Sequence, residues 1–336
     1  GRTLKEVAAV YPTPPMSSAM RDFILWAARY TVSHPGHVLG MALRSRGGLS
    51  PSPTETVYEA TDAAPARITE ARIKLLEAAR RLGPQSASVL SEAAGVSAGV
   101  VKGLADAGAL RARSVATDLP FDPPDPDRKG AVLTAEQAEA ADALKQSVAA
   151  GAFATFLIDG VTGSGKTEVY FEAIAEALRA DPDSQILVLL PEIALTQAIL
   201  SRFEARFGAT PAPWHSGLSD KERRRTWREV ANGRARIVIG ARSALFLPFL
   251  KLKLIIIDEE HDGSYKQEDG VTYHARDMAV MRAKLEDAIV VLASATPALE
   301  TVVNAETGRY QRLQLSARPG ASRLPDVDLV DLRKVP

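Results

Sequence analysis

Cysteine is absent from this chain of 336 residues, so disulfide bonds and thiolate metal sites are excluded within it. No apolar run approaches the roughly 20 residues that a transmembrane helix needs, and the residues from Gly1 onward do not form a signal peptide. The net charge is zero, so any nucleic acid would have to be held by local basic patches and not by a global field. We therefore expect a cytoplasmic protein without a membrane partner.

The composition that remains is that of an ordinary globular protein, with 46% apolar and 24% charged residues. The length allows two or three domains, and a first residue other than Met suggests a chain that has been cut or processed. Two stretches are typical of connectors: RGGLSPSP (46–53) and DLPFDPPDPDRKG (118–130), the latter with four prolines and four aspartates. The second stretch predicts a stiff, polar linker that does not join a core.

Between the connectors the pattern predicts a small helical unit. Its first helix, at 67–82, places five apolar residues on one face: Ile68, Ala71, Leu75, Ala79 and Leu82. SASVLSEAAGVSAGVVKGLADAGAL (86–110) then predicts a helix, a turn at Gly95 and another helix. This last helix should direct four residues inward: Val96, Val100, Leu104 and Ala107.

A possible strand, LRARSVA, completes a helix-turn-helix unit of the winged type. The second helix offers only Lys102 against Asp106, whereas a helix that reads a DNA groove normally carries several basic or amide side chains. A scaffold or a phosphate-contacting module is therefore favoured over a sequence reader, and both readings stay open.

From residue 131 onward, apolar β-rich runs alternate with amphipathic stretches. The runs lie at 153–158, 186–190, 236–240, 253–257 and 288–293. Nearly continuous apolar strands are what a parallel sheet buried on both faces requires, so we expect an α/β domain with helices on both sides of the sheet.

GVTGSGKT (160–167) carries the pattern of a phosphate-binding loop between a strand and a helix. The backbone N–H groups of such a loop point at phosphate oxygens, the lysine reaches the β- and γ-phosphates, and the threonine hydroxyl binds Mg²⁺. The expected nucleotide contacts come from Gly160, Thr162, Gly163, Ser164, Gly165, Lys166 and Thr167.

LKLIIIDEEHD (252–262) ends an apolar strand in consecutive acids, at the edge where α/β sheets bind ligands. Asp258 is expected to hold Mg²⁺ through a water, and Glu259 to orient and deprotonate the attacking water. Taken alone, an acidic pair after a strand is as often a solvated cap as a functional site. Ninety residues after a phosphate loop, it predicts nucleotide hydrolysis.

At this point the residues resemble superfamily 2 helicases. D-E-E-H at 258–261 is a variant of their DEAD/DEAH box, and Ser294–Thr296 matches their Ser-Ala-Thr motif. Longer stretches resemble the replication-restart helicases of the PriA type (primosomal protein N′). These are GVTGSGKTEVY, LLPEIALT (189–196), HSGLSDKER (215–223), IVIGARSALFLP (237–248), DEEHDGSYKQEDGVTYHARD (258–277) and SATPALET.

The resemblance implies a RecA-like, P-loop parallel sheet in an ATP-dependent 3′→5′ DNA helicase that restarts replication at stalled forks. ATP and Mg²⁺ would be its cofactors, with forked and single-stranded DNA, single-stranded DNA-binding protein and primosome proteins as partners of a monomer. Residues 1–60 would be the last part of a domain that binds DNA 3′ ends. A winged helix (61–117), the linker (118–130), the first helicase lobe (131–318) and the start of a further segment (319–336) would follow.

Individual roles also follow from the resemblance. His261 would join Lys166, Asp258 and Glu259 in catalysis. Ser294 and Thr296 would couple the state of the γ-phosphate to movement of the strand. The phosphates of one DNA strand would be contacted by Pro191–Thr196, with Thr196 itself among the contacts. Ser216, Gly217, Arg242 and Ser243 would have the same role.

The segment 262–277 places aromatic residues among basic ones directly after the acidic box. Such a loop could stack bases beside phosphate contacts, through Tyr265, Lys266, Tyr273, His274 and Arg276. The alternative is that the tyrosines pack the loop onto the sheet.

Two further motifs have two readings each. Gln137 could contact adenine, or it could close a capping box with Thr134. Ser219 and Glu222 could cap a helix whose KERRR run is a solvated face and not a DNA patch.

The replication-restart family continues into a cysteine-rich zinc element and a second lobe that carries an arginine finger. We therefore expect zinc only in the remainder of the full-length protein, and we expect residues 1–336 to be an N-terminal fragment that does not unwind DNA. The competing functions are another superfamily 2 translocase, a P-loop kinase or transporter ATPase, and an inactive DNA-binding module. A transporter ATPase would need the signature LSGGQ, which is absent. A kinase would not need D-E-E-H. An inactive module is opposed by Lys166, Asp258 and Glu259, which are intact.

Overall fold

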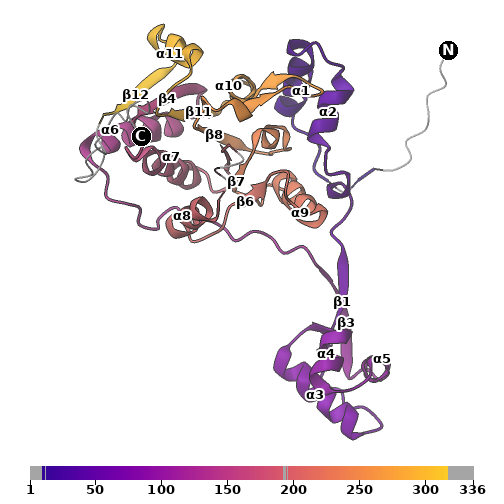
Figure 1. Ribbon diagram of the computed structural model, residues 1–336. Coiled ribbons are helices and arrows are strands. Elements are labelled where there is room, and N and C mark those ends of the chain that lie inside the picture. Colours follow the sequence, from indigo (N-terminus) through magenta and orange to yellow (C-terminus); the bar gives the residue numbers. More distant parts are fainter. Residues whose placement is uncertain (1–9, 12, 192–193, 195, 317–336) are drawn as a thin grey trace, which may run out of the picture. The chain divides into compact units, whose positions relative to one another are not determined.

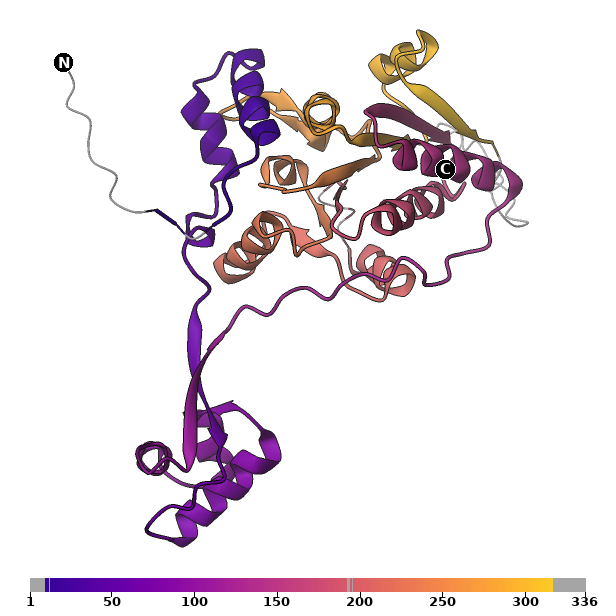
Figure 2. The ribbon, with the colours of Figure 1, turned by 180° about the vertical axis from the view of Figure 1, so that it is seen from behind.

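The computed structural model describes residues 10–11, 13–191, 194 and 196–316. The chain divides into two compact units, which are described separately (Figures 1 and 2). The small unit is Ser50–Leu119, and the large unit comprises residues 1–49 and 120–336. The predicted segment 319–336 lies outside the described residues. No described helix combines the length and the apolar character needed to cross a membrane.

The small unit is a three-helix, three-stranded winged-helix arrangement. Its elements are β1 (Thr54–Ala60), α3 (Glu70–Leu82), β2 (Gln85–Ser86), α4 (Ala87–Ala94), α5 (Ala98–Asp106) and β3 (Leu110–Ala116). The antiparallel sheet has the order β2-β1-β3, with Thr54 opposite Ala116 and Ala60 opposite Leu110. Because β1 pairs with β3 along its whole length, the predicted boundary at residue 60 is wrong, and this strand belongs to the small unit.

The helix faces of the small unit were predicted only in part. Leu75, Ala79 and Leu104 are buried in its core as expected. Ile68 precedes α3 and is 69% exposed, because the helix begins only after the cap at Thr69. Ala107 is also exposed, since α5 ends at Asp106, and Val101 is buried in its place.

The large unit is built on a seven-stranded sheet in which every pair of neighbours is parallel. Its order is β12 (Gln311–Leu315), β4 (Ala154–Gly160), β11 (Ile289–Ser294), β8 (Leu252–Asp258), β5 (Gln185–Leu189), β7 (Ile237–Gly240) and β6 (Ala212–Trp214). The five predicted runs are its five inner strands, so the expected α/β fold is confirmed. The two strands at the edges were missed, because β6 is short and contains a proline and β12 is largely polar.

Helices cover both faces of this sheet, and side chains alternate between the faces along each strand. Ile186 and Val188 of β5 pack on one side with α6 (Ala135–Ala150), α7 (Lys166–Ala180) and α8 (Gln197–Phe207). Leu187 and Leu189 pack on the other side with α9 (Asp220–Ala231) and α10 (Ala275–Glu286). The helix α11 (Leu299–Glu306) lies between β11 and β12 in the chain.

Two N-terminal helices, α1 (Ser18–Tyr30) and α2 (Pro35–Ala42), also belong to the large unit. Phe23 of α1 is fully buried, with its ring 5.5 Å from that of Phe246. Trp227 of α9 donates its indole N–H to the carbonyl of Ala42 at 2.8 Å. The prediction that residues 1–60 form part of a separate domain is therefore wrong for these helices, which share the core of the sheet.

The proline-rich linker also lies against the large unit from Pro120 onward. The N–H of Asp125 donates to the carbonyl of Phe207, and Arg206 donates to the carbonyl of Arg128, both at 2.7 Å. The guanidinium of Arg225 stacks on the ring of Phe121 at 4.1 Å. The linker is therefore not a free spacer, because arginine side chains satisfy its carbonyls.

The KERRR run at the start of α9 was expected to be a solvated face. The cap itself is confirmed, since Ser219 and Glu222 form both halves of a capping box. However, Arg223 and Arg225 are only half exposed, and both donate hydrogen bonds to carbonyls outside the helix. The solvated-face reading is wrong for these arginines.

Candidate functional site

The predicted phosphate loop joins β4 to α7 in a conformation that requires its glycines. Gly163 and Gly165 have φ angles of 81° and 84°, which side chains rarely adopt. A Cβ on Gly160 would lie 2.5 Å from Ser164 Oγ. Ser164 Oγ is buried and makes no hydrogen bond within the described residues. The loop therefore leaves a cradle of backbone N–H groups at the N-terminus of α7.

Lys166 lies inside this cradle. Its side chain is 7% exposed, and Nζ donates a hydrogen bond to the carbonyl of Gly160 at 2.8 Å. A neutral carbonyl compensates a buried ammonium only partly, whereas a phosphate oxygen compensates its charge. The position therefore suits an anionic ligand.

Asp258 and Glu259 follow β8 at the same edge of the sheet. Tyr170 of α7 donates its phenol O–H to Asp258 Oδ2 at 3.0 Å, which ties the acidic box to the helix of the phosphate loop. Burial raises the pKa of Asp258, and the neighbouring charge of Glu259 adds to this rise. Glu259 has a φ of 49°, and its side chain remains 42% exposed.

Thr167 begins α7 beside Lys166 and contacts a side chain from another helix. Arg202 of α8 donates to Thr167 Oγ1 at 3.3 Å and to Glu168 Oε1 at 2.6 Å. No group of three or more metal-ligating side chains occurs in the described part of the chain. A Mg²⁺ ion held by one hydroxyl, one carboxylate and nucleotide oxygens needs no such group.

Gln137 makes the contacts of the predicted capping box. It closes a capping box with Thr134 at the start of α6. Its Nε2 also donates to the carbonyl of Ser164 at 2.8 Å, which connects α6 to the phosphate loop. The capping prediction is confirmed, and a contact between Gln137 and adenine remains a prediction.

The acidic box contacts the Ser-Ala-Thr motif directly. His261 Nδ1 lies 2.7 Å from Ser294 Oγ, and the N–H of Thr296 donates to the same oxygen at 3.0 Å. Glu260, to which the sequence assigned no role, is fully buried. It accepts hydrogen bonds from Arg276 at 2.9 Å, from the N–H of Ala298 at 2.7 Å and from Thr301 at 3.1 Å.

The aromatic segment does not present the predicted stacking surface. Tyr265 and Tyr273 are 1% and 6% exposed, and Arg276 is 7% exposed because it is paired with Glu260. The phenol of Tyr265 donates to the carbonyls of Asp258 and Leu189, at 2.6 and 3.0 Å. The alternative is therefore correct for both tyrosines: they pack the segment onto the sheet. Lys266 is exposed, and it pairs with Glu268 at 2.8 Å.

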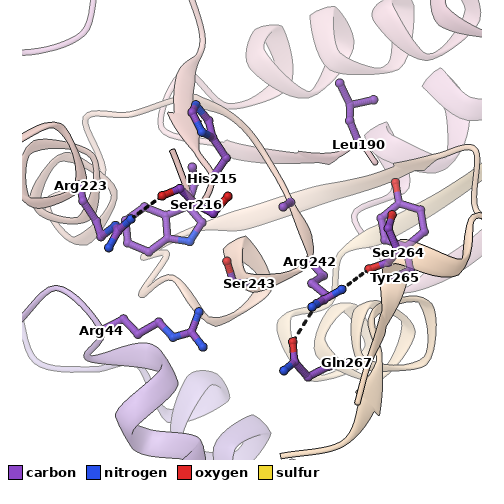
Figure 3. Close-up of a pocket in the computed structure, with 12 residues that line it drawn as sticks. Arg44, Leu190, His215, Ser216, Arg223, Arg242, Ser243, Ser264, Tyr265 and Gln267 are labelled. Carbon is purple, nitrogen blue, oxygen red and sulfur yellow. Dashed lines mark hydrogen bonds between the residues drawn. The ribbon is translucent and has the colours of Figure 1, made fainter. Parts of the chain in front are cut away.

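The predicted strand contacts gather in part around one cavity at the carboxyl ends of β5, β6 and β7. Ser216, Arg242 and Ser243 line this cavity of about 420 Å³ (Figure 3). Gly217 follows Ser216 directly, and Thr196 is the exposed N-cap residue of α8. Within the predicted stretch Pro191–Thr196, residues 192, 193 and 195 lie outside the described residues.

Sequence reasoning missed several further residues of this cavity, among them Arg44, Arg223 and Gln267. Arg242 donates from Nε to Gln267 at 2.8 Å and from Nη1 to the carbonyl of Lys266 at 3.1 Å. Arg223 donates to the carbonyl of Ser216 at 3.1 Å. No motif marks Arg44, because it reaches the cavity only through the packing of α2 on the large unit.

Comparisons with known proteins identify relatives of this chain. Replication restart protein PriA of Rickettsia felis is 48% identical over 178 residues, covering 53% of this chain and 27% of that protein. The PriA proteins of Chlamydia pneumoniae and Bacillus subtilis are 47% and 45% identical, over 64% and 60% of this chain and 28% and 25% of theirs. The chain therefore spans about a quarter of the length of these relatives. The expected similarity to replication-restart helicases is confirmed.

A solved structure of RecG bound to a three-way DNA junction is 22% identical, with a TM-score of 0.44, over 58% of this chain and 25% of that one. The model of the DEAD/DEAH box helicase family matches residues 134–305, slightly more than half of the 336 residues. This match includes the phosphate loop, the acidic box and the Ser-Ala-Thr motif. The chain belongs to the DEAD/DEAH box helicase family.

Proposed function

We propose that this chain supplies the ATP-binding lobe and accessory DNA-binding modules of a 3′→5′ DNA helicase that restarts replication at stalled or abandoned forks. One observation carries the proposal: the phosphate loop, the acidic box and the Ser-Ala-Thr motif form one connected site beside a cavity lined by arginines. The similarity to PriA proteins supports the replication-restart role in particular.

The described residues fit a Mg·ATP complex. The buried Ser164 Oγ in the loop makes no hydrogen bond with any described residue, and the ammonium of Lys166 donates to the neutral carbonyl of Gly160. Thr167 and Asp258 would hold Mg²⁺, and Gln137 would support the loop that contacts the phosphates. ATP supplies a phosphoanhydride bond whose hydrolysis drives the cycle. Lys166 stabilises negative charge on the reacting phosphate, and Glu259 orients the attacking water and accepts its proton.

The contacts behind the site provide a route from nucleotide to strand. His261 binds Ser294, and buried Glu260 binds the start of α11 through the N–H of Ala298 and the hydroxyl of Thr301. A shift of the acidic box on hydrolysis would therefore move the Ser-Ala-Thr segment. This is how Ser294 and Thr296 would couple nucleotide state to strand movement.

The proposed strand path runs along the carboxyl edge of the sheet. Ser216, Gly217, Arg242 and Ser243 would contact phosphates of one strand, with Thr196 and Lys266 further along. The winged-helix unit would contribute phosphate contacts to forked DNA. Single-stranded DNA-binding protein and primosome proteins would be partners of the complete protein, which would act as a monomer and carry zinc in its remaining part.

Strand displacement by the complete protein tests the proposal. Forks that carry either a 3′-tailed or a 5′-tailed arm, each with one labelled strand, are incubated with ATP and Mg²⁺. We expect displacement on the 3′-tailed fork and stimulation of primosome assembly on a fork without a replicative helicase. Displacement without primosome assembly would instead indicate the alternative, another superfamily 2 translocase of the fork-reversal or restriction type. A protein that displaces neither arm would contradict the helicase proposal.

A further inference from the structure

The cavity that contains Ser216 and Ser243 is markedly cationic. We call it the arginine cavity; Arg44, Arg223 and Arg242 line it from three sides, together with His215 (Figure 3). None of the lining residues that the structure describes is Asp or Glu. Guanidinium groups that converge without a carboxylate form a binding site for an oxyanion, because their planar N–H groups match phosphate geometry.

The three arginines differ in how they are held. Arg242 and Arg223 are fixed by hydrogen bonds to neutral oxygens, which orient the guanidinium groups without cancelling their charge. Arg44 is exposed, and its side chain makes no hydrogen bond or ion pair with any described residue. Arg44 is therefore available to a ligand.

Tyr273 shows that two of these charges lie close together. Burial raises the pKa of Tyr273 to about 12, and the positive charges of Arg242 and Arg44 both oppose that rise. Arg44 comes from the segment after α2, whereas Arg242 begins the 3₁₀ turn Arg242–Phe246 after β7. Two segments far apart in the sequence thus place like charges around one space.

A second cavity, of about 550 Å³, adjoins the first and shares Arg44 and Gln267 with it. We call it the α2 cavity; it lies between α2 and the segment of β9 (Lys266–Gln267) and β10 (Tyr273–His274). A Cβ on Gly40 would meet nothing within 4 Å, so the helix backbone is open on this side. The other lining residues include His37, Met41 and Asp269.

The two cavities have complementary chemistry. The arginine cavity suits a phosphate. Apart from the shared Arg44 and Gln267, the α2 cavity is lined by the acidic residue Asp269, open backbone, an imidazole and a thioether. This part suits an uncharged ring with hydrogen-bond donors better than a second phosphate. A phosphate followed by a base is what a single nucleic-acid strand presents.

We propose that α2 and Arg44 extend the strand path of the large unit, with Arg44 holding a backbone phosphate in the arginine cavity and the α2 cavity receiving the adjoining nucleoside. This inference rests on the proposed function, and it assigns DNA contact to a helical segment outside the family match at residues 134–305. Arg44 would act with Arg242 on one phosphate, and Gln267 would lie where the two cavities meet.

Two variants test the two halves of the proposal in the complete protein. Arg44→Ala removes the unpaired guanidinium. Gly40→Leu fills the α2 cavity, and it should not impair folding, because the site is open and leucine favours a helix more than glycine does. Arg29→Leu is the matched control for both, since Arg29 is an exposed arginine of α1 that lines neither cavity.

Fluorescence anisotropy with labelled oligo-dT of increasing length, at several salt concentrations, gives the measurement. We expect Arg44→Ala to weaken binding about tenfold or more and to reduce the salt slope by about one. Gly40→Leu should leave the dependence of affinity on salt concentration unchanged. It should remove the gain in affinity that the wild type shows when the oligonucleotide is lengthened.

The outcomes separate this proposal from the one on which it rests. Wild-type protein that does not bind oligo-dT contradicts the proposed function itself. Wild-type binding with both variants equal to Arg29→Leu overturns only the extended path. Competition of inorganic pyrophosphate or ATP with labelled oligo-dT identifies the anion. If Arg44→Ala weakens the binding of pyrophosphate or ATP but not that of oligo-dT, the cavity holds a free phosphate and not a strand.

Discussion

His261 and Ser294 are joined by a contact of 2.7 Å between Nδ1 and Oγ, which links the acidic box to the Ser-Ala-Thr motif. Ser294 is fully buried, and its oxygen also accepts the N–H of Thr296. The serine thus contacts both the acidic box and the segment that follows β11. Its hydroxyl is well placed to carry a signal without taking part in hydrolysis.

Ser294→Ala should therefore separate hydrolysis from unwinding. We expect the variant of the complete protein to keep most of its basal ATP hydrolysis and to lose several-fold in strand displacement per ATP hydrolysed. The ratio of the two rates, measured on the same forked substrate, checks this. Thr307→Ala, which removes an exposed hydroxyl beyond the end of α11, is the control. An equal loss of both rates would show that Ser294 supports catalysis itself.

Lys166→Ala should abolish ATP hydrolysis while DNA binding at low salt persists. The ammonium lies in the phosphate cradle, and Lys166 does not line the arginine cavity. Loss of one preorganised charge at a reacting phosphate typically costs about 10²–10³ in rate. A phosphate-release assay with and without forked DNA measures the effect, and hydrolysis equal to that of the wild type would refute the assignment.

Glu259→Gln should retain nucleotide binding and lose turnover. The side chain is 42% exposed, and its carboxylate lies 3.6 Å from His261 and not in the phosphate loop, so its replacement should not disturb the cradle. Removing a general base typically costs about 10²–10⁴ in rate. Equilibrium binding of a fluorescent ATP analogue, compared with single-turnover hydrolysis, distinguishes the two effects. A large loss of affinity would place Glu259 in binding instead.

Tyr265→Phe should destabilise the large unit, because Tyr265 has a structural role in place of the predicted stacking role. The single phenol O–H is shared between two carbonyls, those of Asp258 and Leu189. Leaving such groups unpaired costs about 1–3 kcal/mol in the free energy of unfolding. Urea unfolding followed by tryptophan fluorescence measures this change. Tyr30→Phe, at a tyrosine that is 55% exposed, is the matched control and should have almost no effect.

A result for Tyr265→Phe like that for Tyr30→Phe would contradict the structural role. Weaker binding of single-stranded DNA by Tyr265→Ala, which removes the ring, would then restore the stacking interpretation. The present geometry opposes it, because a ring that is 1% exposed offers no face to a base. A base could stack on Tyr265 only after the segment 263–274 had left the sheet.

The sequence predicted features that are encoded in neighbouring residues. The strand before Gly160, the cap at Thr134 and the cap at Ser219 each depend on a few consecutive residues, and all three are present. The parallel sheet followed from runs of apolar residues that are too continuous for an exposed face. These signals are local, so a single chain without relatives is enough to read them.

The features that were missed depend on packing between distant segments. An alternation of aromatic and basic residues does not reveal that Tyr265 reaches the carbonyl of Leu189, 76 positions away. The residues of α1 do not identify Phe246 as the partner of Phe23. Glu260 had no assigned role for the same reason, since two distant segments, α10 and the start of α11, supply its partners.

The placement of α1 on the large unit gives a last prediction. Phe23 is fully buried against Phe246, and the guanidinium of Arg282, itself fully buried, lies 5.6 Å from the Phe23 ring centre. Truncating a buried phenylalanine typically costs about 3–5 kcal/mol. Phe23→Ala should therefore lower the free energy of unfolding of the large unit by that amount, although Phe23 lies more than a hundred residues before the phosphate loop.

Urea unfolding followed by tryptophan fluorescence reports on this unit alone, because all three tryptophans (Trp26, Trp214 and Trp227) lie in it. Leu25→Ala, at a leucine of α1 that is 44% exposed, is the matched control and should change the free energy by less than about 0.5 kcal/mol. If residues 18–42 instead formed an independent domain, Phe23→Ala would leave the transition seen by Trp214 and Trp227 unchanged. A midpoint shared by Phe23→Ala and wild type would thus contradict the shared core.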